Sequence, residues 1–304
     1  MQDKEGELAA ITGVDGVCMA EPSFPELLRC EYSLCLASVG VPHCVLVDND
    51  ELLGVVVDVD YSVINSCFQS KQLVEEQHVL LCPMLARCSQ AGEGLRKALK
   101  QMADSCGSVH TTRWELICAM AEYYSTTLMC SLPFEGSSLF SYSPERTRGI
   151  GEVVAELDIA GRVLEVGCGY GMSTHALRGC GLEPFAIDND TSLVCEGLQR
   201  GGLRCEHTAV LDARWLSCCF GVHEFDWVVG LMVGSIAPFT QPLWGAVLRE
   251  SIGMAREGVL FSVKESEEIE FVRGVCASAG LDGEVLDRST GGLYDQWWYV
   301  GSLP

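Results

Sequence analysis

At residues 163–171 the chain reads Val163-Leu164-Glu165-Val166-Gly167-Cys168-Gly169-Tyr170-Gly171, an apolar segment that ends in a glycine-rich turn. Glycine lets a backbone approach a ligand closely and takes dihedral angles that other residues avoid. The dinucleotide-binding turn has the spacing Gly-x-Gly-x-x-Gly and directs a helix N-terminus at a pyrophosphate. Here the spacing is Gly-x-Gly-x-Gly, and the acidic Glu165 precedes it. The turn therefore favours a ligand with an ammonium group over one with a pyrophosphate.

A second acidic turn follows at Ala186-Ile187-Asp188-Asn189-Asp190. Nucleotide-binding α/β folds place a ribose-binding carboxylate about 20 residues after the glycine turn, and Asp188 occupies that position. Together the two turns indicate a nucleoside ligand that lacks a pyrophosphate. S-adenosylmethionine is the main candidate, because it carries an ammonium and a sulfonium but no phosphate.

Helical and strand patterns alternate from about Pro144 to the end of the chain, which is typical of a mostly parallel sheet. Ligands of such sheets bind beyond the carboxyl ends of the strands, where the strand order reverses. We expect helices at residues 145–157, 172–178, 191–199, 243–255 and 267–279. We expect strands at residues 162–166, 184–187, 204–208, 226–231, 258–264, 283–286 and 297–301.

Residues 145–304 resemble the class I, seven-strand, Rossmann-like S-adenosylmethionine-dependent methyltransferases, whose first motif matches residues 163–171. The resemblance implies an α/β sheet of order 3-2-1-4-5-7-6 with an antiparallel last strand. It implies that the glycine turn lies along the methionine part, that Asp188 binds the ribose, and that Asp212 contacts the adenine amine with Trp215 nearby. The implied cofactor contacts are Glu165, Gly167, Cys168, Gly169, Tyr170, Gly171, Asp188, Asn189, Asp212, Ala213 and Met232.

The segment after the fourth expected strand departs from part of this family. It reads Gly230-Leu231-Met232-Val233-Gly234-Ser235, without the Asn-Pro-Pro-Tyr-like sequence that holds an amide or a base amine in some relatives. This departure disfavours nucleobase and glutamine-amide methylation, and the segment offers no general base. Tyr142 is the one weak catalytic candidate. Arg146 and Arg148 could bind a carboxylate, but we expect both on the solvated surface. Residues 294–298 either border an acceptor pocket or pack at a strand edge.

The first 140 residues match no motif that we can name. From Cys44 two β-rich arms flank Asp48-Asn49-Asp50 and predict a hairpin. Helical periodicity predicts helices at residues 24–37, 72–87, 92–106 and 112–130, the last with a capping box formed by Thr111 or Thr112 and Glu115. We expect residues 1–140 to form a mixed, mainly helical substrate-recognition region and residues 141–304 to form the catalytic domain.

Composition limits the partners and the location of the chain. The 304 residues are 48% hydrophobic and carry a net charge of −22, which disfavours nucleic acid as a partner. The longest apolar runs are far shorter than the ~20 residues of a membrane span. The 17 cysteines form no Cys-x-x-Cys pair, and no metal is expected because the histidines show no metal spacing with one another. Without a signal peptide at residues 1–5, we expect a reduced, cytoplasmic protein.

These patterns favour an enzyme that transfers one-carbon groups from S-adenosylmethionine and releases S-adenosylhomocysteine. The large first region and the acidic surface favour a protein side chain as the acceptor, and a small metabolite is the alternative. Two other classes stay open, a non-catalytic cofactor-binding scaffold and a nicotinamide dehydrogenase. The scaffold would be expected to show damaged cofactor motifs, and the dehydrogenase would require the Gly-x-Gly-x-x-Gly spacing that is missing.

Overall fold

The computed structural model describes residues 6–60, 77–83, 90–131, 142–289 and 294–303. The chain divides into two units, Met1–Thr127 and Leu128–Pro304. The division expected after residue 140 lies outside the described residues. Each unit has a sheet of its own. Among the described residues, every helix is too short or too polar to span a lipid bilayer.

The second unit is built on a seven-stranded sheet of order β11-β12-β10-β9-β6-β7-β8. Neighbours from β10 to β8 are parallel, whereas β12 is antiparallel to both β10 and β11. Numbered along the chain, this order is 6-7-5-4-1-2-3, so the expected strand order and the antiparallel last strand are confirmed. The strands are β6 (Val163–Val166), β7 (Phe185–Asp188), β8 (Thr208–Val210), β9 (Phe225–Leu231), β10 (Ala255–Val263), β11 (Gly283–Asp287) and β12 (Trp297–Ser302).

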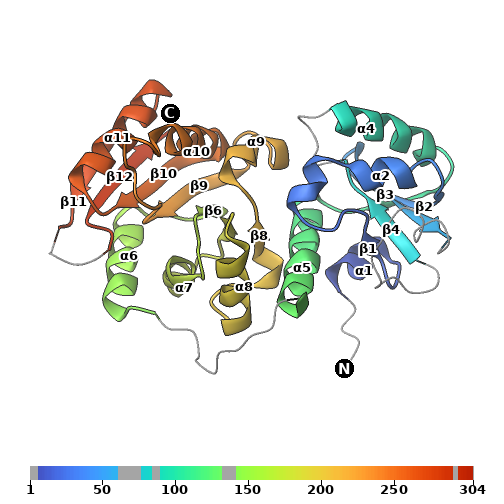
Figure 1. Ribbon diagram of the computed structural model, residues 1–304, viewed down its shortest axis with the longest axis horizontal. Helices are drawn as coiled ribbons and strands as arrows, with labels where there is room; N and C mark the ends of the chain where they lie inside the picture. The colour runs from blue at the N-terminus through green and yellow to red at the C-terminus, as the bar shows by residue number, and fades with distance from the viewer. Residues whose placement is uncertain (1–5, 61–76, 84–89, 132–141, 290–293, 304) are drawn as a thin grey trace. The chain divides into compact units, whose positions relative to one another are not determined.

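Helices cover both faces of this sheet. Figure 1 shows α10 and α11 on one side and α6, α7 and α8 on the other, which is the doubly wound arrangement. Central strands such as β6 are buried along their whole length, as expected for parallel strands covered on both faces. The α-helices are α6 (Pro144–Glu156), α7 (Met172–Gly179), α8 (Thr191–Arg200), α9 (Leu216–Cys219), α10 (Gln241–Met254) and α11 (Ser266–Ser278). Two 3₁₀ turns, η2 (Cys205–His207) and η3 (Ala213–Trp215), flank β8.

Local side chains fix where several of these helices begin. The Ser143 hydroxyl accepts from the backbone N–H of Arg146 at the start of α6, and Asp190 accepts from two backbone N–H groups at the start of α8. Such caps satisfy N–H groups that have no partner within the helix. The third strand, β8, begins four residues after the start of the expected range, 204–208. Residues 205–207 turn as η2, and only Thr208–Val210 pair with β7.

The first unit contains a five-stranded sheet of order β1-β4-β3-β2-β5. The hairpin expected around residues 48–50 is confirmed. Its strands are antiparallel, and Asn49 and Asp50 both have positive φ angles of 45° and 74°, as a tight hairpin turn requires. The strands are β1 (Cys18–Met19), β2 (Val41–Asp48), β3 (Glu51–Val59), β4 (Gln77–Leu81) and β5 (Gly107–His110).

The helices that precede the second sheet in sequence are α1 (Glu7–Thr12), α2 (Glu31–Leu36), α4 (Gln90–Ala103) and α5 (Arg113–Ser131), with a 3₁₀ turn η1 (Pro25–Leu28). The first unit ends within α5, after Thr127. The helices expected at residues 92–106 and 112–130 are confirmed as α4 and α5. The capping box is also confirmed, because Thr112 Oγ1 accepts from Glu115 N and Glu115 Oε2 accepts from Thr112 N. The helix expected at residues 24–37 is split into η1 and α2, and Cys30 between them has a positive φ of 52°.

The helix predicted over residues 72–87 is wrong where the structure describes that stretch. Gln77–Leu81 is β4, which pairs antiparallel with β3. The run Val79-Leu80-Leu81 is buried, and a short apolar run fits a buried strand as well as a helix. Pairing with β3 decides between them. The region expected to be mainly helical thus contains a sheet of which the sequence predicted only the β2–β3 hairpin.

Candidate active site

The glycine turn lies at the point where the strand order of the second sheet reverses. Strand β6 has β7 on one side and β9 on the other, and the turn follows its carboxyl end. The backbone N–H groups of Gly167 and Cys168 both donate to the carbonyl of Ile187, at 2.9 and 3.1 Å. These bonds hold the turn against the end of β7. This position is where α/β folds of this type bind ligands.

Two glycines of the turn border open space, and the third is needed for packing. A Cβ atom built on Gly167 or Gly169 would meet no atom within 4 Å. Gly171 differs, because a Cβ atom there would lie 2.7 Å from the carbonyl oxygen of Gly202. Its φ of 93° also favours glycine. The turn therefore packs tightly where α7 begins and is open at the two earlier glycines, where backbone could face a ligand.

Asp188 joins the glycine turn to the end of β7. Its Oδ2 accepts from the backbone N–H of Gly169 at 2.8 Å, and its Oδ1 accepts from the backbone N–H of Asp190 at 2.8 Å. The side chain is half-buried. A carboxylate has about four acceptor positions, so two remain for hydroxyl groups of a ligand. Asp188 thus has the position and the acceptor capacity that a ribose requires.

Glu165 is placed differently from the expectation that it faces an ammonium group. It is fully buried, and its two carboxylate oxygens accept from Ser173 Oγ at 2.5 Å and Thr174 Oγ1 at 2.6 Å. Burial raises the pKa of the Glu165 carboxyl, and the hydrogen bonds from Ser173 and Thr174 partly offset that rise. Both hydroxyls belong to α7, so Glu165 ties β6 to that helix and fixes the turn between them. In this structure the carboxylate is not open to a ligand.

The other residues of the two turns vary in exposure. Cys168 is buried, and burial, with the nearby charges of Glu165 and Asp188, raises the pKa of its thiol well above the ordinary value. The thiol therefore stays neutral and packs in the core beneath the turn. Tyr170 is half-buried and Asn189 is exposed. In the sequence, Tyr170 follows Gly169 and Asn189 follows Asp188.

Asp212 follows β8 and begins η3. The guanidinium of Arg214 donates to both of its carboxylate oxygens, with Nε 3.0 Å from Oδ1 and Nη2 2.5 Å from Oδ2. These hydrogen bonds hold the pKa of the Asp212 carboxyl below its usual range. Ala213 is buried, and the Trp215 side chain is exposed. A ligand amine at Asp212 would therefore compete with Arg214 for the carboxylate.

A buried polar network that the sequence did not predict begins at Met232, after β9. The Met232 N–H donates to Ser262 Oγ at 2.8 Å, and that hydroxyl donates to Asp295 Oδ1 at 2.5 Å. Asp295 forms an ion pair with Arg146, whose Nη2 also donates to the carbonyl of Leu231. Arg146 is therefore not on the solvated surface as expected. The network connects the start of α6 with the carboxyl ends of β9 and β10.

A cleft of about 770 Å³ lies between α6 and residues that flank β11 and β12. Its lining includes Arg146, Tyr294, Asp295, Gln296 and Trp298. The Arg146 guanidinium carbon lies 5.1 Å from the centre of the Tyr294 ring, a cation–π contact. Residues 294–296 and Trp298 thus border a pocket, one of the two alternatives left open for this segment. The cleft has the size of a small-molecule site.

Tyr142, the weak catalytic candidate, lies just before α6. Its ring centre is 4.5 Å from that of His175 on α7, and the two planes are inclined by 38°. The tyrosine side chain is 47% exposed. Tyr142 therefore contacts α7, the helix that follows the glycine turn.

Strand order and the turns at the carboxyl edge together define a class: the second unit has the Rossmann-like fold of class I S-adenosylmethionine-dependent methyltransferases. No known family profile matches the sequence. No curated protein sequence matches it either.

Three solved structures that resemble the chain are distant from it in sequence. Magnesium protoporphyrin IX methyltransferase from Synechocystis PCC 6803, with bound S-adenosylmethionine, is 18% identical over 51% of this chain and 79% of its own, with a TM-score of 0.40. An amino pentose methyltransferase from Micromonospora echinaspora is 12% identical over 52% and 90%, with a TM-score of 0.41. Phosphoethanolamine N-methyltransferase 2 from Haemonchus contortus is 15% identical over 64% and 60%, with a TM-score of 0.39.

Proposed function

We propose that the chain is an S-adenosylmethionine-dependent methyltransferase whose cofactor binds at the carboxyl ends of β6, β7, β8 and β9. The observation that carries this proposal is the contact between Asp188 and Gly169 at the point where the strand order reverses. This contact places the Asp188 carboxylate, which can accept from two further hydroxyl groups, beside a turn that borders open space. This combination suits a nucleoside with a small charged tail.

Each part of the site has a role in this proposal. Gly167 and Gly169 present backbone to the methionine part, and Asp188 accepts from the ribose hydroxyls. Asp212 accepts from the adenine amine, and Met232 bounds the site from the end of β9. Glu165 acts as a positioning residue, because its bonds to α7 set the conformation of the turn.

When bound, the cofactor supplies an electrophilic methyl group on a sulfonium, which is a good leaving group. The protein then has to align the acceptor and remove water from it, and general-base catalysis is needed only for an acceptor that carries a proton at neutral pH. The residues after β9 provide no carboxylate or imidazole for that task. An acceptor that is nucleophilic without a base, such as a thiolate or a neutral imidazole, suits this site.

We infer that the acceptor is a side chain of another protein. The first unit is a region of 127 residues with its own sheet and core, which is large for a lid over a small molecule. The net charge of −22 favours a basic partner segment. A small metabolite is the second candidate, and the 770 Å³ cleft favours it, because small-molecule pockets commonly measure about 300–1,000 Å³.

Calorimetric titration with S-adenosylhomocysteine tests the cofactor site. Wild type should bind with micromolar affinity, and Asp188→Ala should lose most of that binding. Glu183→Ala is the matched control, because Glu183 flanks the opposite end of β7 and pairs with Arg204 on the surface. Equal binding by all three proteins would contradict the proposed site. Absence of binding to folded wild type would favour the scaffold alternative.

Transfer of a labelled methyl group then separates the two acceptors. The wild-type chain is incubated with a soluble cell extract and labelled methyl donor, and acid-precipitated protein is counted apart from the soluble fraction. Label in protein that disappears with Asp188→Ala supports a protein acceptor. Label confined to the soluble fraction would support the small metabolite instead.

A further inference from the structure

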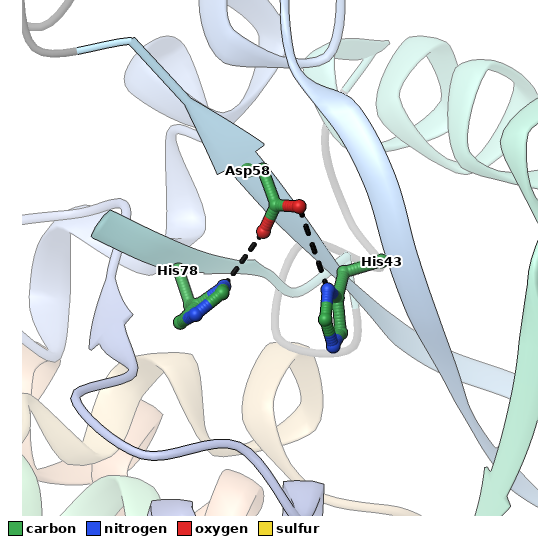
Figure 2. A group of neighbouring side chains, drawn as sticks. All are labelled: His43, Asp58 and His78. Carbon is green, nitrogen blue, oxygen red and sulfur yellow. Dashed lines mark hydrogen bonds and ion pairs between the residues drawn. The ribbon is translucent and has the colours of Figure 1, made fainter. Parts of the chain in front are cut away.

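Two histidines of the first unit converge on one carboxylate. His78 Nδ1 lies 2.6 Å from Asp58 Oδ1, and His43 Nδ1 lies 3.4 Å from Asp58 Oδ2. The two imidazole centres are 5.0 Å apart. Figure 2 shows both rings directed at the carboxylate, one toward each oxygen. The cluster belongs to the first unit, whereas the glycine turn and the cleft belong to the second.

Three neighbouring strands bring these residues together. Asp58 on β3 stands directly opposite His78 on β4 in the antiparallel ladder. On β2 the register shifts between Pro42 and Cys44, so His43 is the extra residue of a bulge beside β3. A bulge changes the direction of a side chain relative to a regular strand. Here the bulge lets His43 face Asp58, although the regular partner of Asp58 on β2 is Val41.

The arrangement brings together two histidines whose positions in the sequence show no metal spacing. Sequence separations of 15 and 20 residues match no metal motif within one helix or turn. The three side chains approach one another across neighbouring strands. Their distances depend on the β3–β4 register and on the bulge in β2. Residues 72–87 were predicted as a helix, so the sequence offered no register in which His78 could meet Asp58.

We propose that His43, Asp58 and His78 form a binding site for a divalent transition-metal ion, with Zn²⁺ as the ion to test first. The three ligand atoms all lie within 4.8 Å of one another. Tetrahedral Zn²⁺ with bonds of 2.0–2.1 Å places neighbouring ligand atoms about 3.3 Å apart. His43 Nδ1 lies 3.4 Å from Asp58 Oδ2, and His78 Nδ1 lies 2.6 Å from the other oxygen, Oδ1. Rotations of these side chains would have to bring both imidazole nitrogens to this spacing from the ligating oxygen and from each other.

The ligand set selects the type of ion. Imidazole nitrogen suits Zn²⁺, Ni²⁺, Cu²⁺ and Fe²⁺, whereas Mg²⁺ and Ca²⁺ prefer oxygen ligands alone. Two imidazoles and one carboxylate also form the protein ligands of known zinc sites that keep a position for water. The three side chains are between 34% and 48% exposed, so solvent can reach the fourth position. We therefore expect three protein ligands and water.

A single hydrogen bond between a histidine and an aspartate accounts for only part of this geometry. A second ring approaches the other carboxylate oxygen at 3.4 Å, so both imidazoles face the same side chain. The second ring also lies close to the first. A cation between the rings would bind all three groups at once and would join β2, β3 and β4 at the same level of the sheet. Metal binding should therefore stabilise the first unit, whether or not the chain transfers methyl groups.

The experiment uses the full chain, stripped of metal with a chelator and kept reduced. Equilibrium dialysis against Zn²⁺ and then Co²⁺ gives the stoichiometry, and the absorption spectrum of bound Co²⁺ reports its ligands. Thermal unfolding is recorded over a series of Zn²⁺ concentrations. The variants are His43→Gln, His78→Gln and Asp58→Asn. The matched control is His110→Gln, which changes an exposed histidine of β5 in the same sheet.

We expect one ion per wild-type chain and an unfolding temperature that rises with Zn²⁺. Each of the three variants should bind at least about 10-fold more weakly, since even groups outside the ligand sphere contribute 10- to 100-fold. The control should behave as wild type. The Co²⁺ spectrum should lack the strong charge-transfer band of a thiolate ligand, which matters in a chain with 17 cysteines. No bound ion, a thiolate spectrum, or equal affinity in all variants would overturn the proposal.

Discussion

Arg146 and Asp295 form a buried ion pair that joins the start of α6 to the segment before β12. Arg146 Nε lies 2.6 Å from Asp295 Oδ2, and the two side chains are 8% and 7% exposed. Ser262 Oγ donates to the same carboxylate, and the Arg146 guanidinium also reaches the Leu231 carbonyl. The pair thus connects elements that surround the carboxyl edge of the sheet. It also forms one wall of the cleft.

Removal of one member of this ion pair should destabilise the folded protein. Asp295→Ala leaves the Arg146 guanidinium buried without its counter-charge, and such changes typically destabilise a protein by about 3–5 kcal/mol. We expect a loss of this size in the free energy of unfolding, measured by urea denaturation followed with circular dichroism. The double variant Arg146→Met with Asp295→Leu should recover much of the loss, because apolar groups can replace a buried pair.

A surface ion pair provides the control. Arg273 and Glu270 pair on α11 with side chains 55% and 53% exposed. Glu270→Ala should change the free energy of unfolding by less than about 1 kcal/mol. If Asp295→Ala is as mild as Glu270→Ala, the pair is not buried in solution as it is in the structure.

Two glycines at the ends of α7 should respond in opposite directions to the same substitution. Gly171→Ala places a Cβ atom 2.7 Å from the Gly202 carbonyl oxygen at a φ of 93°, and we expect a loss of about 1–3 kcal/mol. A Cβ atom at Gly179 meets nothing within 4 Å and the residue is helical, so Gly179→Ala should stabilise by about 0.4–1 kcal/mol. Thermal unfolding of both variants measures this contrast. Equal effects would mean that the turn relaxes around an added methyl group.

The sequence predicts the second unit well because its signals are local. Each parallel strand is a short buried run followed by a turn and an amphipathic helix, so helix and strand periods alternate clearly. Asp188 could be placed at the end of β7 because the turn and the strand precede it directly. Its hydrogen bond to Gly169 follows from the parallel pairing of β6 and β7.

Long-range pairing accounts for what the sequence missed. Arg146 and Asp295 are 149 residues apart, and nothing near either residue indicates the other. The partners of Glu165 lie only 8 and 9 residues away, but they depend on how α7 packs on β6. In the first unit, β4 is a strand because β3 lies beside it. The same register brings Asp58 to His78.

Glu165 should make stability depend on pH in a predictable direction. Burial raises its pKa above the ordinary value of 4.5, so the folded chain holds this proton more tightly than the unfolded chain. The stabilisation from Glu165 is therefore complete below about pH 4.5 and is lost as the pH rises through the folded-state pKa. In Glu165→Gln the side chain has no proton to lose, so this decrease in stability at higher pH is absent. The hydroxyls of Ser173 and Thr174 can still form hydrogen bonds with the amide.

We therefore expect Glu165→Gln to become more stable relative to wild type as the pH rises above about 4.5. Urea unfolding curves of both proteins at a series of pH values measure the difference. Parallel pH profiles for Glu165→Gln and wild type would show that the carboxyl titrates alike in the folded and unfolded chains, contrary to its burial.

Tyr142 should contribute to cofactor binding through its ring. The ring lies against His175 on the helix that follows the glycine turn. If the ring also packs on the cofactor, that aromatic contact is worth about 0.5–1.5 kcal/mol, and Tyr142→Ala should weaken S-adenosylhomocysteine binding by about 2- to 10-fold. Tyr142→Phe keeps the ring and should bind like wild type. If Tyr142→Ala also leaves binding and turnover unchanged, Tyr142 has no part in the site.

Asp212 and Arg214 should affect nucleoside binding with opposite signs. The Arg214 guanidinium occupies both oxygens of Asp212, and its own side chain is 48% exposed. If the adenine amine binds Asp212, it has to displace this surface pair, which is worth about 0–1 kcal/mol. Arg214→Ala should therefore tighten S-adenosylhomocysteine binding by up to about 5-fold, whereas Asp212→Ala should weaken it. Arg204→Ala is a suitable control, because Arg204 pairs with Glu183 at the other end of β7. Weaker binding in Arg214→Ala would indicate instead that Arg214 holds Asp212 in the conformation that binds the ligand.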